Sequence, residues 1–331
     1  MRTNDRSHGD NPMKRLAAAF ALCLLAGTAI AQERFPAKPI QLVIPLAAGT
    51  SADVVFRPIA ERLSQKLGQP VVLNHRPGAS GTIAADSVAK AAPDGYTLLY
   101  VNSVHTANPS LLSRLPYDTL RDFAGIAMVA ESPTIVVVYP GLGVRTVKEL
   151  IALAKRQPGK INYGTSGVGT TTHLAGAYFA ARAGIDMVAV PYKGVELLAD
   201  LVAGRIEVFV APIPALMPFI RDNKLIPLAI TSRTPMKTPL ELLTVETAAE
   251  LPGFEFTNIA GFVAPAKVPR PIIELLSREL RAAAQDKGDQ DKRLALGVFP
   301  RDLGPEEFDA FIRADVERIG ELVKSLGIKP N

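Results

Sequence analysis

Short apolar runs alternate with amphipathic stretches along most of this chain of 331 residues. Apolar runs bounded by proline or glycine predict buried strands, and apolar side chains that recur every three or four positions predict helices packed against them. Strands and helices that alternate at this spacing predict parallel sheets with right-handed crossovers. The predicted strands are 39–45, 71–73, 96–101, 161–163, 187–190, 206–210 and 226–231, and the predicted helices are 51–67, 82–91, 147–156, 170–184, 196–203, 216–222, 271–284 and 305–324.

Two longer extended stretches predict crossings between two lobes. The first consists of Gly125–Ala130 and Thr134–Tyr139, separated by a break at Glu131–Pro133, and the second is Phe254–Ala264. We therefore expect a hinged α/β protein in which the last two helices pack on the first lobe. The predicted first lobe is discontinuous, 32–130 and 255–331, and the predicted second lobe is 131–254.

The first 31 residues have the features of an export signal. Lys14 and Arg15 precede an apolar run from Leu16 to Gly27, which is too short to span a bilayer as a stable helix. Ala29-Ile30-Ala31 matches the small-x-small cleavage pattern. We expect a protein exported to the periplasm, with the signal removed near Ala31 and a mature chain that begins at Gln32.

The composition of the chain argues against several classes of function. The only cysteine, Cys23, lies within the predicted signal, and Phe20–Leu22 is a poor lipobox, so we expect neither a lipid anchor nor disulfides. The net charge of +5 is mild and no basic block is present, which argues against a nucleic-acid partner. Because His75, His105 and His173 do not have metal-ligand spacing, we expect no metal and no cofactor.

A glycine-rich turn, Gly164–Gly169, joins a predicted strand to a helix that opens with Thr170–Thr172. Such a turn lets backbone N–H groups close around an anion, and the helix start adds its positive dipole end. No Lys or Arg lies between Asn162 and Phe179, so neutral donors would hold the anion. This favours a small carboxylate over a polyphosphate. The alternative is that the glycines only make a tight connection and the threonines only cap the helix.

The turn does not match three better-known glycine motifs. A phosphate-binding loop needs lysine where Thr170 stands, and a dinucleotide-binding turn needs glycine where Thr172 stands. A hydrolase nucleophile elbow needs glycine where Val168 stands. These mismatches leave the carboxylate site and the structural connection as the two interpretations.

Ligands of open α/β sheets bind beyond the carboxyl ends of the strands. This rule places four loops at one cleft, two from each lobe, and a ligand that touches both lobes would favour a closed form. We expect Asn102–Asn108 to be a polar loop. The four loops are Leu46–Ser51, Asn102–His105, Gly164–Thr172 and Pro191–Gly194.

The motifs in these loops resemble those of the Bug-type periplasmic receptors of tripartite tricarboxylate transporters. The resemblance runs from about Phe35 to the C-terminus and is carried by PLAAGTSADVVFRP, NHRPGASGTIAADSVAKAAPDGYTLL, INYGTSGVGTTTHLAG, VPYKG and LPGF. It implies a type II periplasmic-binding-protein fold and a small organic carboxylate as the ligand. It also implies delivery to a permease of two integral membrane subunits, by a receptor that we expect to be monomeric.

The resemblance and the loop positions together give a set of candidate ligand-binding residues. Asp53 could instead serve only its helix start, and His173 and Tyr192 could serve only packing. Thr50 stands where relatives often have glycine, and Ala211 stands where they often have aspartate, so the far end of the site is expected to be less polar. The candidates are Ala48, Gly49, Thr50, Ser51, Asp53, Asn102, Ser103, Ser166, Gly167, Gly169, Thr170, Thr171, Thr172, His173 and Tyr192.

Three other functions remain to be compared with the receptor. A hydrolase could use Ser166 and His173, although no nucleophile elbow or paired carboxylates support it. The effector domain of a transcription regulator would need a DNA-binding helix pair where the predicted signal stands. A periplasmic sensor that feeds a signalling partner has the same sequence features as a transport receptor. We therefore expect a binding protein and not an enzyme.

Overall fold

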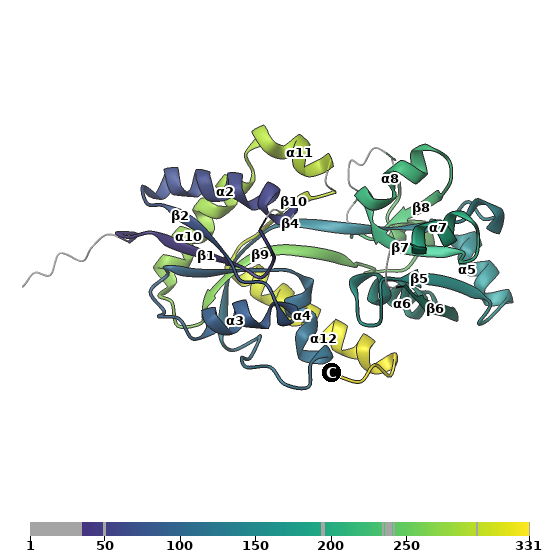
Figure 1. The fold of residues 1–331 in the computed structure, drawn as a ribbon, viewed down its shortest axis with the longest axis horizontal. Coiled ribbons are helices and arrows are strands. Elements are labelled where there is room, and N and C mark those ends of the chain that lie inside the picture. The colour runs from purple at the N-terminus through teal and green to yellow at the C-terminus, as the bar shows by residue number, and fades with distance from the viewer. Residues whose placement is uncertain are drawn as a thin grey trace, which may run out of the picture. The chain divides into compact units, whose positions relative to one another are not determined.

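Strand β4 (Phe123–Val138) is the central element of the sheet. The strands pair in the order β2-β1-β3-β9-β4-β7-β5-β6, and β8 and β10 also pair with β4 (Figure 1). In this computed structural model the described residues are 35–48, 51–192, 196–233, 235, 240, 242–295 and 297–330. The predicted signal, 1–31, lies outside them. All the elements described below belong to one unit, Lys38–Asn331.

Most of the predicted strands and helices are present with closely similar bounds. The described strands are β1 (Ile40–Ile44), β2 (Val71–His75), β3 (Thr97–Val101), β4, β5 (Ile161–Thr165), β6 (Met187–Pro191), β7 (Val208–Pro212), β8 (Ile226–Ile230), β9 (Thr257–Pro265) and β10 (Phe299–Leu303). The described helices are α2 (Ser51–Leu67), α3 (Thr82–Ala89), α4 (Ser103–Leu111), α5 (Val147–Arg156), α6 (Thr171–Ala183), α7 (Glu196–Val202), α8 (Ile213–Arg221), α9 (Val245–Ala249), α10 (Arg270–Ala284), α11 (Gln290–Ala295) and α12 (Pro305–Ser325).

The strands form two groups that share β4. In the first group β1 pairs in parallel with β2 and β3, and β9 is antiparallel to both β3 and the part of β4 from Phe123 to Pro133. In the second group β5 pairs in parallel with β6 and β7, and the part of β4 from Thr134 to Val138 is antiparallel to β7 and β8. The predicted parallel pairings are therefore present within each group, and antiparallel strands join them.

Four local predictions were wrong or incomplete. Strand β4 continues through Glu131–Pro133, where a break was expected, because residues 131–133 pair with β9. The predicted polar loop Asn102–Asn108 is the start of helix α4. Pro58 lies inside a helix that begins at Ser51, so the expected shortening of the start of α2 is absent, while the alternative, a kink, stays a prediction. Strand β10 and helices α9 and α11 were not predicted.

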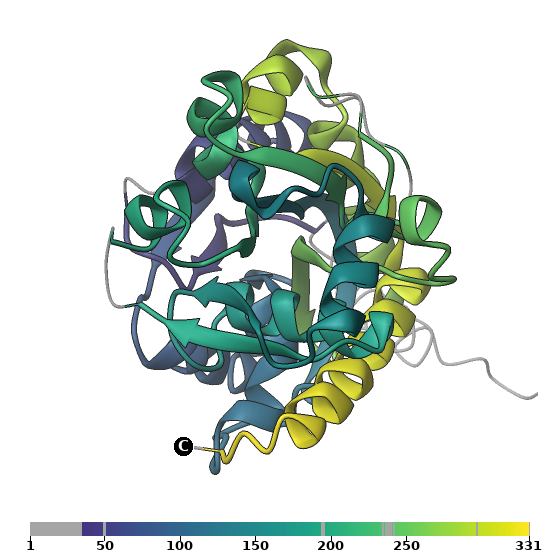
Figure 2. The ribbon, with the colours of Figure 1, turned by 90° about the vertical axis from the view of Figure 1, so that its right-hand side faces the viewer.

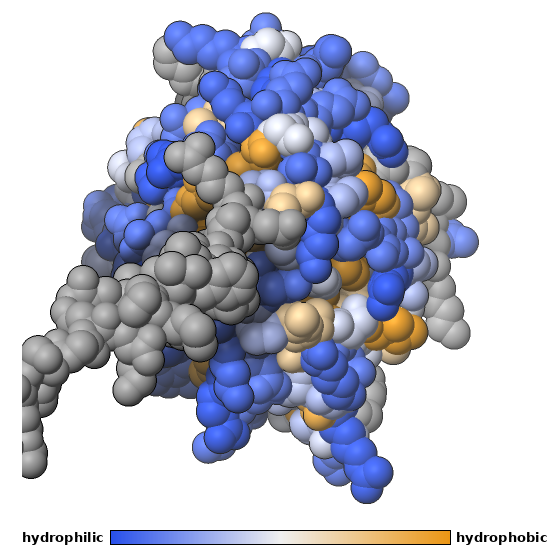
Figure 3. All heavy atoms as spheres, turned by 90° about the vertical axis from the view of Figure 1, so that its left-hand side faces the viewer, coloured by the Kyte–Doolittle hydropathy of each residue, from blue (hydrophilic) through white to orange (hydrophobic). Residues whose placement is uncertain are grey.

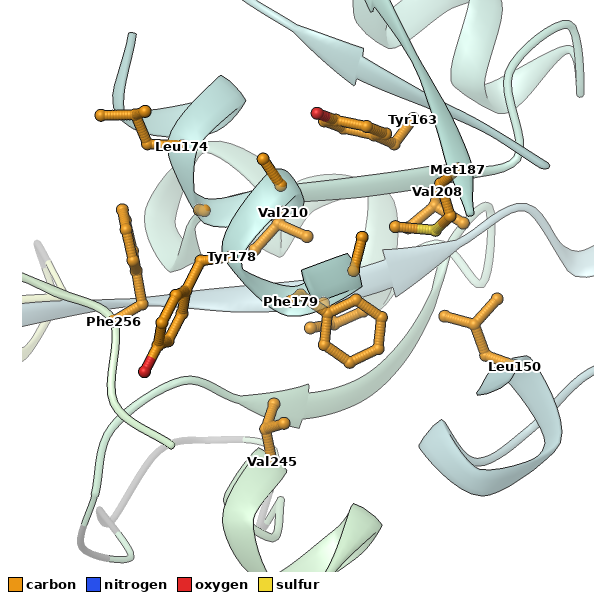
Figure 4. Close-up of a cluster of buried hydrophobic side chains, with 14 of the residues drawn as sticks. Leu150, Tyr163, Leu174, Tyr178, Phe179, Met187, Val208, Val210, Val245 and Phe256 are labelled. Atoms are coloured by element: carbon orange, nitrogen blue, oxygen red, sulfur yellow. The ribbon is translucent and has the colours of Figure 1, made fainter. Parts of the chain in front are cut away.

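Buried side chains fill both faces of each strand group. The largest cluster packs α5, α6 and α9 against β5, β7 and β8, and Figure 4 shows Tyr178, Phe179 and Phe256 among its aromatic members. Ile319, Leu322 and Val323 of α12 belong to the same cluster. Helix α12 contacts α4 and β4, in line with the predicted packing on the first lobe, and it also reaches α6, a contact that was not predicted (Figures 1 and 2).

The surface carries few apolar side chains. On the face shown in Figure 3, described residues are mostly hydrophilic and apolar ones are scattered. Within the described ranges, no helix is both long and apolar enough to cross a membrane.

Candidate ligand-binding site

The side chains of the turn between β5 and α6 hold its ends in place. Thr170 is the N-cap of α6: its Oγ1 accepts a hydrogen bond from the His173 N–H at 3.4 Å and donates one to the Gly167 carbonyl at 2.7 Å. Thr172 Oγ1 accepts a hydrogen bond from the Ser166 N–H at 2.9 Å. Thr172 therefore faces the turn. The expectation that one of the three threonines caps the helix is confirmed for Thr170.

Most backbone donors of this turn already have partners. The Gly167 N–H donates to Thr165 Oγ1 at 3.2 Å, the Gly169 N–H donates to His173 Nδ1 at 3.1 Å, and the Thr170 N–H donates to the Gly167 carbonyl at 3.3 Å. Positive φ angles at Gly167 (118°) and Gly169 (78°) permit this inward arrangement. The turn therefore offers an anion fewer free N–H groups than the sequence suggested, and side-chain donors matter more.

His173 is held in its neutral form by its contacts. Its Nδ1 accepts the Gly169 N–H, so the ring proton lies on Nε2, and the imidazole can act as an uncharged donor. The ring is 7% exposed and stacks on Tyr163, with centroids 6.4 Å apart. Burial lowers the pKa of His173, which further favours the neutral ring.

The start of α4 is fastened to strand β9. Asn102 is the N-cap, and its Oδ1 accepts the Val104 N–H at 3.0 Å. Ser103 Oγ donates to the Thr257 carbonyl at 3.2 Å and accepts the Ile259 N–H at 3.1 Å. These bonds join segments more than 150 residues apart in sequence and fix where α4 begins.

A cavity of about 850 Å³ lies between the start of α4 and the start of α6. Its lining brings together five of the candidate residues: Ser103, Gly169, Thr170, Thr171 and His173. Among the described lining residues the only charged side chain is Lys329, which follows α12. Apart from Lys329, the donors that the cavity offers to an anion are thus hydroxyls, an imidazole and amides.

A second cavity of about 200 Å³ adjoins the first. It is lined by Asn102, His105 and the turn around Ser80, and it shares Ser80, Val104 and Asn108 with the larger cavity. Asn108 is 2% exposed, and its side-chain amide donates to the Ser80 carbonyl at 3.0 Å. Asn102 therefore lies in the wall of the smaller cavity, while its neighbour Ser103 lines the larger one.

The remaining candidates that the structure describes are not brought into either cavity. Ala48 is exposed in the turn after β1, Ser166 is exposed, and Gly167 and Thr172 line neither cavity. The Tyr192 hydroxyl donates to Asp200 at 2.9 Å, which supports the packing alternative for this residue. Gly49 and Thr50 lie outside the described residues, as do the side chains of Ser51 and Asp53, whose backbone forms the first turn of α2.

Thr171 is the hydroxyl best placed for a ligand. It is half-buried, lines the larger cavity and, within the described part of the chain, its side chain has no hydrogen-bond partner. Thr170 and Thr172, by contrast, are engaged in the turn and 3.1 Å from each other through their hydroxyl oxygens. Thr171 can therefore donate to a bound anion without breaking an existing bond.

Sequence reasoning missed several parts of the cavity wall. These are the later turns of α4, Phe256 in the segment before β9, Ile319 on α12, and the residues after α12. No local motif marks them, because they meet the predicted loops only through long-range packing of α12 against α4 and α6. Ala211, expected near the ligand's far end, is 1% exposed in a hydrophobic cluster and lines neither cavity.

The geometry does not support catalysis by Ser166 and His173. Ser166 is exposed and its N–H is bound to Thr172, while His173 Nδ1 accepts from Gly169. A general base must lie within hydrogen-bond reach of its nucleophile, and no such bond joins the two residues in the described structure. The described ranges also contain no group of three or more His, Cys, Asp or Glu side chains placed to hold a metal ion.

Comparison with known proteins agrees with this geometry. Residues 55–328 match the model of the tripartite tricarboxylate transporter family receptor. The chain is 35% identical to protein BugT of Bordetella pertussis over 329 residues, which cover 96% of this chain and 99% of BugT.

Two solved structures share both fold and sequence with the chain. Rpa4515 of R. palustris, solved with adipate, has a TM-score of 0.68 and 32% identity, and the match covers 90% of this chain and all of that one. The periplasmic binding protein BugD has a TM-score of 0.66 and 29% identity, with the same coverage. The fold is therefore the α/β fold of periplasmic binding proteins, and the chain belongs to the tripartite tricarboxylate transporter receptor family.

Proposed function

We propose that this protein is a periplasmic receptor that captures a small organic carboxylate in the cavity between α4 and α6. The observation that carries the proposal is the meeting of Ser103, Thr171 and His173, three uncharged polar residues, at one cavity beside two helix starts. Helix starts attract anions, and neutral donors hold them reversibly. Adipate in the related Rpa4515 supports a carboxylate ligand.

Reversible capture requires only moderate binding energy. Micromolar affinity corresponds to about 8 kcal/mol. Hydrogen bonds to a charged group contribute about 1.5–3 kcal/mol each, so three or four donors supply much of this before ordering costs are subtracted. The Thr171 hydroxyl, the His173 Nε2–H and the Lys329 ammonium line the cavity as donors, and no arginine is required.

Ligand capture is coupled to closure of two lobes, 32–130 with 255–331 and 131–254. Support comes from the sharing of β4 between the two strand groups, with α4 on one side of the cavity and α6 on the other. A ligand that contacts both sides favours the closed form by its differential affinity. The closed form then docks on a membrane permease of two integral subunits.

The protein reaches the periplasm through the signal predicted at residues 1–31. The binding role also implies that the receptor performs no chemistry of its own. Both statements are supported by the family and by the periplasmic relative BugD. Loss of carboxylate uptake on gene deletion, with the permease intact, distinguishes a transport receptor from a sensor.

A thermal-shift screen of the purified protein tests the carboxylate assignment. Small mono- and dicarboxylates should raise the melting temperature, because a ligand that binds only the folded state stabilises it. Sugars and cationic amino acids should leave it unchanged. A shift with a sugar alone would contradict the assignment, and mass spectrometry of a co-purified small molecule would then identify the true class.

A further inference from the structure

Each wall of the larger cavity changes from polar to apolar with distance from its helix start. On α4 one face presents Ser103 in the first turn and then Ala107 and Leu111, while the amide of Asn108, which also lines the cavity, donates to the Ser80 carbonyl and the Tyr117 hydroxyl. On α6 the first turn presents Thr171, and Leu174 follows three positions later. Positions three or four apart lie on one helix face, so each helix lines the cavity with a polar head and an apolar continuation.

Exposed apolar side chains also gather at this cavity. Among the described residues eight large apolar side chains are exposed, and three of them line this one space. They are Val104 on α4, Val168 in the turn before α6, and Leu326 just after α12, with exposures of 38%, 69% and 37%. Apolar side chains from three separate elements that converge on one cavity mark a surface that a ligand covers.

The scarcity of charged residues in the described lining also favours a ligand with a large apolar part. Lys329 is the only charged residue in the described lining, and no Asp or Glu lines it. A compact ligand with several charges or hydroxyls would face Leu111, Leu174 and Phe256, which offer it no hydrogen bond. A ligand with one polar head and a long apolar body would instead match both parts of the wall.

We infer that the receptor selects carboxylates with an extended apolar body, such as a saturated chain, bound head-first at Thr171 and His173. The body lies against Val168, Leu174, Phe256 and Leu326. The end of α12 and the residues after it thereby become determinants of specificity. This ligand class presupposes the carboxylate-receptor function proposed above.

Calorimetric titration with butanoate, hexanoate and octanoate tests the ligand class. Burial of each methylene should tighten binding about fourfold, so each two-carbon step should tighten it roughly fifteenfold. Equal affinity along the series would overturn the apolar body and leave the receptor function standing. If no carboxylate bound at all, both would be overturned.

Variants of two lining residues, with matched controls, test whether the apolar body of the ligand lies in this cavity. Val168→Thr and Leu326→Gln should at least halve the gain in affinity per two-carbon step. Val188→Thr and Leu243→Gln are the controls, because these two apolar residues are 42% and 56% exposed but do not line the cavity. An unaltered gain in the Val168→Thr and Leu326→Gln double variant would place the body elsewhere and overturn the inference.

Discussion

Helices α4 and α6 start in the same way but are fixed in place by different means. Each begins with a polar cap residue, Asn102 or Thr170, followed three positions later by a buried histidine, His105 or His173. His105 stacks on Tyr117 with centroids 5.7 Å apart, as His173 stacks on its own tyrosine. The two starts thus share a cap, a spacing and a stacked imidazole.

The bonds around the two starts differ. Ser103 ties α4 to β9, a strand far away in sequence. The α6 turn is tied to itself, through Thr170, Thr172 and His173. A start fixed to the sheet can keep its position when the cavity is empty, whereas a self-contained turn can move as a unit with α6. The comparison therefore predicts a fixed wall at α4 and an adjustable wall at α6.

The largest expected difference between the two helix starts comes from their histidines. It concerns how the free energy of unfolding depends on pH. Burial lowers the pKa of His105 from 6.5 to about 4, and its Nε2 has no hydrogen-bond partner in the described structure. The folded state therefore binds fewer protons than the unfolded state in this range, and stability falls as the pH drops from 6.5 to 4. This one group should contribute a loss of about 3 kcal/mol.

Urea unfolding at several pH values checks this expectation. His105→Phe keeps a ring to stack on Tyr117 and should flatten the pH dependence between 6.5 and 4. His173→Phe is the matched variant and should flatten it less, although burial also lowers the pKa of His173. An equal slope in His105→Phe and the unmodified protein would refute the buried neutral imidazole.

Removal of one hydroxyl should destabilise the protein more at the α4 wall than at the α6 wall. Ser103→Val removes the partner of the Thr257 carbonyl and of the Ile259 N–H, and should cost about 2 kcal/mol of unfolding free energy. Thr172→Val leaves the Ser166 N–H in an exposed turn where water can replace the bond, and should cost about 1 kcal/mol or less. Chemical denaturation measures both, and the opposite order would reverse the assignment of the two walls.

The smallest effect on stability is expected at Thr171. Its hydroxyl has no partner among the described residues, so Thr171→Val should leave the melting temperature unchanged. Loss of a donor to a bound carboxylate should weaken binding about tenfold or more, equivalent to about 1.5 kcal/mol. Calorimetry with a carboxylate found in the screen measures this. Unchanged affinity in Thr171→Val would move the anion away from α6.

The predictions that held depended on local features. A capping residue directly after Gly169 sets the start of α6, and Thr146 with Glu149 forms a capping box at the start of α5. The error at Asn102–Asn108 has a local reason too. Polar residues and Pro109 resemble a loop, yet the Asn102 cap and burial of the helix against α12 favour α4.

The candidate site was only partly accessible from the sequence. The turn at 164–172 was found because its glycines and threonines are consecutive. Its donors could not be assigned, because whether Thr171 or Thr172 faces the ligand depends on how Gly167 and Gly169 fold the turn. The sequence left the role of Tyr192 open for a similar reason, since its bond to Asp200 on the following helix depends on the tertiary structure.

By itself the sequence determined the alternation of strands and helices, the helix caps and the absence of Lys and Arg from the turn at 164–172, all of which follow from residues close together in the chain. The tertiary structure alone decided that β4 runs unbroken through both strand groups and that α12 reaches α6. It also decided that Leu326 and Lys329 border the cavity. These features depend on pairing and burial between segments that are distant in the sequence. A local sequence pattern does not indicate the free energy of such contacts.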